Sequence, residues 1–420
     1  MSMVSPPICQ IIKQMLHIVS SPLSENLDAS QREALKFALL QKELAVIHGP
    51  PGTGKTTTVV EVVTQSVRSG CKVLCCAPSN VAVDNLLERL AANRLKVVRL
   101  GHPARVAADL QRHSLDAIIS QSDQTQLVKD ARSDIDKTLA QVKRARSKGE
   151  RAGLWGRLKE LRKEVNERER KAVKEILGRA EVVVSTLTSA SLDGPLKQLP
   201  DNHFDITVID ECSQVCIVVS VRVCRILPLF PLLKAVEIAC WVALPYSRKA
   251  ILAGDHLQLP PTIMSSEAAK KGLEKTLMER VIEHWGAQVV RMLTTQYRMN
   301  AKIMDWSSEA LYEKRLVAHE SVAGRLLKDM SGIAEDENSK EPLVLIDTAG
   351  CDMYELEAGD EVSKANEGEV ALTVIHVDQL IKSGLKAEDI AVITPYNLQV
   401  HLSEPKALVW GSKGEAILVV

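Results

Sequence analysis

A glycine-rich stretch directly after an apolar run most constrains the fold of this chain. The run "LAVIHG" (44–49) is typical of a buried strand, and "GPPGTGKTT" (49–57) leads from it into a helical pattern. This is the GxxxxGK[ST] pattern in the strand–loop–helix context that it requires. Its glycines let backbone N–H groups approach phosphate oxygens, and the helix start adds the positive end of its dipole. The stretch predicts a phosphate-binding loop within an α/β fold.

The polar residues of this loop fit a nucleoside triphosphate. The amine of Lys55 is expected to reach the β- and γ-phosphates, and the hydroxyl of Thr56 is expected to hold Mg²⁺. The chain has no Asn-Lys-x-Asp motif for guanine, which weakens a GTPase interpretation. The residues predicted to contact the nucleotide in this loop are Gly49, Pro50, Pro51, Gly52, Thr53, Gly54, Lys55, Thr56 and Thr57.

Short apolar runs alternate with helical patterns along most of the chain. Near-continuous Val, Ile and Leu are typical of strands buried on both faces, so we predict parallel sheets between layers of helices. A second series of runs suggests another α/β unit that begins near residue 286. The first series lies at 44–49, 72–79, 181–187, 205–211, 249–255 and 288–293, and the second at 342–350 and 389–396.

A pair of acids ends the apolar run "DITVIDE" (205–211). Alone, such a pair is usually a solvent-facing end of a strand. Downstream of a phosphate-binding loop, Asp210 is predicted to hold Mg²⁺ through water, and Glu211 is predicted to orient the attacking water as a base. The sequence thus predicts both halves of a nucleotide-hydrolysing site.

The segment 143–171 differs in composition from its surroundings, with twelve Lys and Arg against five Glu. We predict a helical insertion here, covering about residues 110–178. It is either a solvated helix face with i,i+4 ion pairs or, with its local charge of +7, an arm that contacts phosphates. The apolar positions at helical spacing are Leu154, Leu158, Leu161 and Val165.

The overall composition sets limits on partners and compartment. Net charge is zero and the pI is about 7.1, so any basic surface must be local. The nine cysteines show no zinc-type spacing, which favours reduced thiols in the cytoplasm, the nucleus or both. The apolar run 215–233 contains Arg222, Arg225 and prolines, and is a poor membrane span. We therefore expect no membrane association.

Further motifs follow in a defined order. "LDASQREAL" (27–35) resembles a Q motif, and "APSNVAVDNLLERL" (77–90) resembles motif Ia. "GDHLQLPPT" (254–262) resembles motif III, "LTTQYRMN" (293–300) motif IV, and "ITPYNLQV" (393–400) the motif that follows it. Residues 23–400, apart from one segment, therefore resemble the superfamily 1 helicases of the nonsense-mediated-decay group.

The resemblance implies an α/β fold of two RecA-like P-loop NTPase domains with parallel sheets and a helical insertion in the first. It implies ATP and Mg²⁺ as cofactors, single-stranded RNA or DNA as partner, and movement in the 5′-to-3′ direction. Besides Lys55, Asp210 and Glu211, the resemblance assigns four residues to the ATP. These are Gln31 reading adenine, Gln258 sensing the γ-phosphate, Tyr297 beside the base and Arg298 on the phosphates.

In the same way, Pro78, Ser79 and Asn80 of motif Ia are expected to contact the backbone of the nucleic acid. The alternative for these three is a loop that caps a helix at Ser79 or Asn80. The basic segment 143–171 corresponds to a helical subdomain that the group inserts at this place. The sequence does not indicate any protein partner.

The expected organisation departs from the group at both ends. We expect a leader at 1–22, a first RecA-like domain at 23–285 and a truncated second domain at 286–420. The β-barrel that the group carries before its Q motif is not expected, nor are motifs V and VI. Because motif VI supplies arginines for the transferring phosphoryl group, a non-catalytic nucleotide- or nucleic-acid-binding fragment is the alternative to an active helicase.

An extra apolar segment, 215–234, separates "DECSQ" from the helix expected at Ala235. Without it, the spacing of the group holds throughout. One hypothesis is a genuine insertion packed as a strand or helix beside the site. The other is a short intron read through in frame, because Val-Cys can encode a donor site and Lys an acceptor. Sequencing the transcript across residues 214–235 distinguishes them, since an intron is absent from the main mRNA.

Overall fold

The computed structural model contains two compact units, Met1–Thr295 and Gln296–Val420. The sequence placed this boundary between residues 285 and 286. The expected leader 1–22 and the extra segment 215–234 lie outside the described residues. The structure describes residues 26–121, 134–142, 147–191, 193–213, 235–258, 260–261, 267, 269–357, 363–410 and 418–419.

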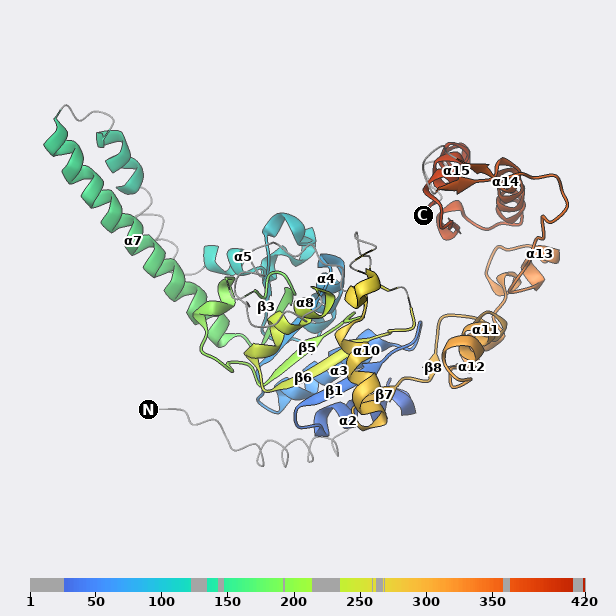
Figure 1. The fold of residues 1–420 in the computed structure, drawn as a ribbon, viewed down its shortest axis with the longest axis horizontal. Helices are drawn as coiled ribbons and strands as arrows, with labels where there is room; N and C mark the ends of the chain where they lie inside the picture. The colour runs from blue at the N-terminus through green and yellow to red at the C-terminus, as the bar shows by residue number, and fades with distance from the viewer. Residues whose placement is uncertain are drawn as a thin grey trace. The chain divides into compact units, whose positions relative to one another are not determined.

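The first unit is built on a seven-stranded parallel sheet in the order β3-β4-β2-β5-β6-β1-β7 (Figure 1). All six runs predicted as strands in this part are strands, and β3 is an additional one. The sheet confirms the predicted α/β class. Its strands are β1 (Leu44–His48), β2 (Val73–Ala77), β3 (Val97–Leu100), β4 (Val182–Thr186), β5 (Ile206–Ile209), β6 (Lys249–Gly254) and β7 (Val290–Met292).

Helices cover both faces of this sheet because successive residues of each strand point to opposite sides. On β2, Leu74 belongs to one buried cluster and Cys75 to the other. The cluster around Cys75 includes side chains from α2 (Ala29–Leu40), α3 (Lys55–Arg68) and α4 (Asn80–Ala92). The cluster around Leu74 includes side chains from α7 (Lys148–Arg179), α8 (Ala235–Ala243) and α10 (Leu277–Trp285).

The basic segment forms most of α7, and the C-terminal end of this helix joins the core through Leu177. Leu158 and Val165 are buried, and Leu154 and Leu161 are partly buried, which confirms the apolar face. Ion pairs at i,i+4 follow the helix at Glu164–Arg168, Lys163–Glu167 and Glu175–Arg179. The predicted ion-paired surface is present, and phosphate contact stays a prediction. The insertion also contains α5 (Leu115–Ser120).

The second unit has little regular sheet. Its expected strand 342–350 has no regular secondary structure, and the described strand within 389–396 is the two-residue β12 (Ala391–Val392). The apolar residues are present, but a strand also needs a hydrogen-bonded neighbouring strand. The strand pairs β10–β11 and β12–β13 of this unit join only two residues of each strand. The other elements are α11 (Ala301–Leu311), α12 (Glu320–Ala323), α13 (Glu337–Lys340), α14 (Glu367–Lys382), α15 (Asn397–Trp410), β8 (Thr295–Gln296), β9 (Val317–Ala318), β10 (Leu356–Glu357), β11 (Lys364–Ala365) and β13 (Leu418–Val419).

In the part of the chain that the structure describes, no helix has both the length and the apolar character to cross a membrane. Five of the six described free cysteines are buried, and Cys351 is exposed. The 3₁₀ turns are Pro103–Arg105, Ala108–His113, Pro195–Gln198, Leu244–Tyr246, Gly286–Gln288, Leu327–Asp329 and Ala387–Asp389, and a π-type turn lies at Ala269–Leu273.

Candidate nucleotide site and nucleic-acid loop

The predicted phosphate-binding loop joins β1 to α3 and needs glycine at two positions for steric reasons. A Cβ atom at Gly49 would lie 2.6 Å from the Cβ of Lys55. Gly54 caps α3 in the left-handed conformation, with φ of 73°, and a Cβ there would lie 2.5 Å from Nε2 of Gln31. The loop is therefore closed tightly over the start of the helix, as the sequence pattern predicted.

Buried polar contacts fix the middle of the loop. The Thr53 hydroxyl donates to the Pro50 carbonyl at 2.7 Å, and Nε2 of Gln31 donates to the Thr53 carbonyl at 2.9 Å. Gln31 also closes the N-terminus of α2, where its Oε1 accepts from the backbone N–H of Asp28. Gln31 thus supports the phosphate-binding loop, a contact that the sequence did not predict. Adenine reading stays a prediction for this residue.

The structure brings Lys55, Asp210 and Glu211 together. Nζ of Lys55 donates to Oδ1 of Asp210 at 2.7 Å and to Oε1 of Glu211 at 2.5 Å. Lys55 begins α3 after β1, and the two acids follow β5, so the parallel sheet presents all three at the carboxyl ends of its strands. Residues 155 positions apart in sequence therefore share one site.

Burial and charge act in opposite directions on this site. Burial by itself lowers the pKa of the Lys55 amine, but the Asp210 and Glu211 carboxylates beside it offset this, and the pKa is raised above its usual value. Lys55 is therefore a cation at neutral pH. A single lysine between two carboxylates can move to phosphate oxygens when a triphosphate enters, because those oxygens carry more negative charge.

The remaining loop residues offer oxygen atoms. Thr56 is the second residue of α3 and is half-buried, and Thr57 is exposed, with its hydroxyl accepting from Arg89 at 3.2 Å. The Thr56 hydroxyl and the Asp210 carboxylate are the kind of hard oxygen ligands that Mg²⁺ takes. These residues therefore fit the predicted magnesium ion chemically. Half-buried Pro51 and Gly52 complete the turn, with φ of 76° at Gly52.

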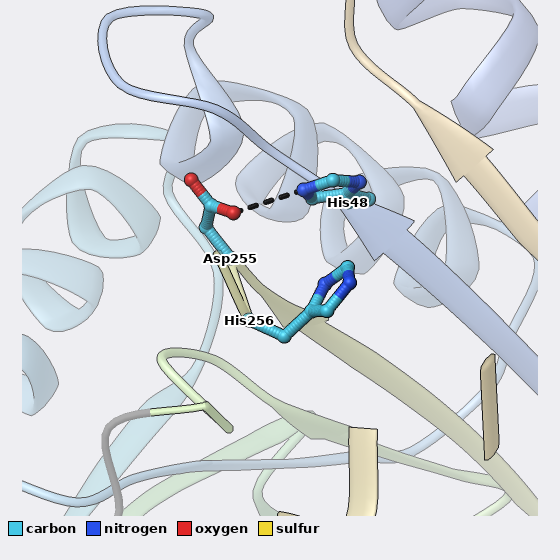
Figure 2. Close-up of side chains that lie close together, drawn as sticks. All are labelled: His48, Asp255 and His256. Carbon is cyan, nitrogen blue, oxygen red and sulfur yellow. Dashed lines mark hydrogen bonds and ion pairs between the residues drawn. The ribbon is translucent and has the colours of Figure 1, made fainter. Parts of the chain in front are cut away.

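A second polar group follows β6. Asp255 receives hydrogen bonds from Nε2 of Gln258 at 2.8 Å and from the backbone N–H of Leu257 at 3.2 Å. Its other neighbour is His48, whose Nε2 lies 2.9 Å from Oδ1 of Asp255 (Figure 2). Gln258, the predicted γ-phosphate sensor, is thus held by an acid that also contacts the residue just before the phosphate-binding loop.

The predicted nucleic-acid loop lies between β2 and α4. Ser79 is exposed and caps α4, accepting from the Ala82 N–H at 3.1 Å, while Pro78 and Asn80 are half-buried. The capping alternative is therefore correct for Ser79, and it leaves the hydroxyl at the surface. Oδ1 of Asn80 accepts from Nη2 of Arg99 at 2.8 Å.

Arg99 is fully buried and connects this loop to its surroundings. Its Nε donates to Oδ1 of Asp84 at 3.2 Å, and Oδ2 of Asp84 accepts from the Ala107 N–H. A buried guanidinium thus fixes Asn80 to β3 and to the start of the insertion. Sequence patterns did not predict this contact, because an arginine in an apolar run is normally expected at the surface.

Tyr297 and Arg298 belong to the second unit. Both are exposed, and the Tyr297 ring lies 4.6 Å from the ring of His319. The backbone N–H of Arg298 donates to Oε1 of Gln296 at 2.8 Å, and the turn is completed by Gln296 Nε2 donating to the Met299 carbonyl. Their predicted contacts with ATP are untested.

Two protein families, both described as "AAA domain", match the chain. One covers residues 26–221 and 234–266, and the other covers 273–407. The first match omits 222–233, inside the predicted extra segment 215–234. A genuine insertion and a read-through intron would each leave such a gap. Together the two families indicate two RecA-like domains, as the sequence predicted.

Curated relatives agree with these families. The chain is 53% identical over 376 residues to the DNA-binding protein SMUBP-2 of Mesocricetus auratus, which covers 90% of this chain and 36% of that protein. It is 36% identical to the DNA polymerase alpha-associated DNA helicase A of Schizosaccharomyces pombe, covering 90% of this chain and 54% of the other. The Drosophila melanogaster Regulator of nonsense transcripts 1 homolog is 32% identical, and the match covers 91% of this chain and 29% of that protein. The chain thus spans about a third to a half of these relatives.

One solved structure with a similar course is the DNA complex of the Arterivirus nonstructural protein 10 helicase. It covers 69% of this chain and 44% of its own, with a TM-score of 0.34 and 12% identity, which is too distant to support an inference. Two further motifs, "VRLGHPARV" (98–106) and "LIDTAGCDM" (345–353), resemble the SMUBP-2 type within the helicase group, and the 53% identity confirms that resemblance.

Proposed function

Because this chain belongs to the AAA-domain ATPases of the superfamily 1 helicases, we propose that it uses ATP hydrolysis to move 5′ to 3′ along single-stranded RNA or DNA. The observation that carries the proposal is the contact of Lys55 with both Asp210 and Glu211. This contact joins the phosphate-binding loop after β1 to the acid pair after β5, two strands away in the sheet. Such a site hydrolyses a nucleoside triphosphate when the triphosphate displaces the lysine from the acids.

Each residue then has a defined task. Lys55 neutralises the β- and γ-phosphates, Thr56 and Asp210 hold Mg²⁺, which supplies charge neutralisation when bound, and Glu211 accepts a proton from the attacking water. Gln258 responds to the γ-phosphate through its bond with Asp255. Tyr297 and Arg298 are assigned to the base and the phosphates by their motif.

Nucleic acid is proposed to lie against the loop of Pro78, Ser79 and Asn80. Support comes from the exposed Ser79 hydroxyl at the N-terminus of α4, where backbone N–H groups favour phosphate. The name of the hamster relative includes DNA binding, and that of the fission yeast relative includes DNA helicase. The choice between RNA and DNA, and a cytoplasmic or nuclear location, are part of the proposal.

The test measures ATP hydrolysis by the full chain with and without a poly-pyrimidine single strand. We expect stimulation by the strand and its loss in Lys55→Ala, where one donor of the phosphate site is removed, by about 10²- to 10³-fold. Lys382→Ala on the exposed surface of α14 is the matched control and should keep full activity. Strand binding without any hydrolysis would instead identify the non-catalytic binding fragment.

Direction is tested on duplexes with a single-stranded tail at either the 5′ or the 3′ end, in RNA and in DNA. Unwinding of the 5′-tailed duplex alone is the expected result. Asn80→Ala should weaken strand binding while hydrolysis without nucleic acid stays unchanged. Preference for the 3′ tail would overturn the proposed direction.

A further inference from the structure

The site described above leaves one half-buried histidine, His256, without a role. Nδ1 of His256 is fully buried and, among the described residues, is one of two buried side-chain nitrogen or oxygen atoms without a hydrogen-bond partner. The other is Nε2 of His203. A buried polar atom without a partner costs about 1–3 kcal/mol, so such an atom calls for an explanation. A bound metal ion is one explanation for a buried imidazole nitrogen without a hydrogen-bond partner.

His256 does not stand alone. Its ring lies 4.8 Å from the ring of His48, and His48 contacts Asp255 (Figure 2). One ligand atom from each of His48, Asp255 and His256 lies within 4.8 Å of the others. In the described part of the chain, this is the one group of at least three such residues so close together.

The strands place these residues rigidly. His48 is the last residue of β1 and pairs in register with Gly254, the last residue of the neighbouring β6, so Asp255 and His256 begin the next loop beside it. The backbone N–H of Asp255 donates to the Ser213 hydroxyl at 3.0 Å, which fixes the start of that loop. Such outer contacts orient ligands at metal sites.

We propose that His48, Asp255 and His256 form a binding site for a divalent ion of the zinc class. Two imidazoles and one carboxylate are the ligand set of many three-residue zinc sites, and ligands bound at about 2.1 Å lie roughly 3.4 Å apart. The present separations, 2.9 Å for His48 to Asp255 and at most 4.8 Å overall, bracket that value. Small rotations of these three side chains would therefore bring their ligand atoms to the spacing of a bound zinc ion.

The position of the site gives the ion a consequence. Asp255 also accepts the Nε2 hydrogen bond of Gln258, so an ion that draws on this carboxylate restrains the residue assigned to the γ-phosphate. An ion here would therefore inhibit ATP hydrolysis. This consequence rests on the proposed function, whereas binding of the ion does not. The Mg²⁺ predicted at Thr56 and Asp210 is a separate ion with oxygen ligands.

Binding is tested with the full chain in a Cys351→Ser background, because Cys351 is the exposed thiol among the described cysteines. Co²⁺ is titrated without nucleotide and followed by its visible absorption, and Zn²⁺ is then added in competition. We expect about one ion per chain, with the strong absorption of a four-coordinate site. X-ray absorption at the zinc edge should then show two imidazole ligands.

His256→Phe keeps a ring of similar shape and removes both nitrogens, so its affinity should fall by at least about tenfold. His284→Ala, at an exposed histidine, is the matched control and should bind as the parent does. Binding of a fluorescent ATP analogue verifies that His256→Phe is folded. Equal affinity of parent and His256→Phe, or a zinc spectrum without two imidazoles, would overturn the site.

The same samples separate this proposal from the proposed function. If Zn²⁺ binds and inhibits hydrolysis in the parent but not in His256→Phe, both stand. If Zn²⁺ binds with two imidazoles but the chain has no ATPase activity to inhibit, the metal site stands and the proposed function fails. If the chain hydrolyses ATP but binds no zinc, only the metal site is wrong.

Discussion

The two units of the chain differ in how their apolar side chains are used. The first unit buries two large clusters against the two faces of seven parallel strands. The second has a small described cluster around Val377 and Ala387, and its apolar run Leu343–Ile346 is exposed, with Leu345 91% accessible. Similar apolar runs in the two units thus reach very different degrees of burial.

The difference in burial explains why the predicted site residues of the first unit are held more firmly than those of the second. Lys55 begins α3 after the loop that follows β1, Asp210 follows β5, and both strands are held by the core on both faces. Tyr297 and Arg298 lie in a turn fixed by Gln296 and are exposed. Substitutions in the first unit should therefore have large effects, and matched substitutions in the second should have small ones.

The largest effect is expected for Glu211→Gln. Gln keeps the size of the side chain and can accept from Lys55, but it cannot act as a base, so ATP turnover should fall about 10²- to 10⁴-fold while nucleotide binding is kept. Steady-state hydrolysis and binding of a fluorescent ATP analogue measure the two. Glu355→Gln, at an exposed acid of the second unit, should change neither. Equal losses of ATP turnover in Glu211→Gln and Glu355→Gln would contradict the expected difference between the two units.

Next is the buried ion pair. Asp84→Ala leaves the fully buried guanidinium of Arg99 without its carboxylate, and should lower the free energy of unfolding by about 3–5 kcal/mol. Glu355→Ala breaks the exposed pair with Lys364 and should cost about 0–1 kcal/mol. Urea unfolding followed by circular dichroism compares them. A loss below 1 kcal/mol for Asp84→Ala would show that water reaches Arg99.

Apolar truncations sharpen the same comparison. Leu86→Ala in α4 opens a cavity in the first core and should cost about 2–5 kcal/mol, because Leu86 is buried. Leu345→Ala removes the same atoms from an exposed side chain and should change stability by less than about 0.5 kcal/mol. A cost above 2 kcal/mol for Leu345→Ala would mean that this run is covered in solution. Both are measured by urea unfolding.

The smallest effect depends on pH. Burial lowers the pKa of Lys249 from 10.5 to about 8. Between these values the unfolded chain binds more protons than the folded chain, so stability rises with pH from about 8 to 10.5, and below pH 8 the full cost of the buried charge is present. Lys249→Met also loses the hydrogen bond to the Leu39 carbonyl, and we expect a net gain of about 1–3 kcal/mol at pH 7 that shrinks toward pH 10.

The control for this prediction is Lys364→Met in the second unit, where the lysine is partly exposed. It should show no pH-dependent difference from the parent between pH 7 and pH 10. Unfolding midpoints in urea across this range measure both variants. If the stability difference between Lys249→Met and the parent grows with pH, the pKa of Lys249 is not lowered in the folded chain.

Much of the first unit could be predicted from sequence because its signals are local. Strands such as Val73–Ala77 are apolar throughout, and the loop from Gly49 needs glycine where a Cβ would collide. The pattern fails at 342–350, where an equally apolar run has no strand neighbour. Local composition records that a segment can be buried, whereas pairing depends on residues elsewhere in the chain.

Residue types at short spacing were enough to predict the fold class and the helicase family, and they assign the phosphate-binding residues as a prediction. Only the tertiary structure decided which distant side chains meet. It placed Lys55 between Asp210 and Glu211, Gln31 on the Thr53 carbonyl, Arg99 beside Asn80, and His48 with Asp255 and His256. The lysine and histidine contacts join residues at or after the carboxyl ends of β1, β5 and β6, and strand order is set by packing of the whole sheet rather than by any local pattern.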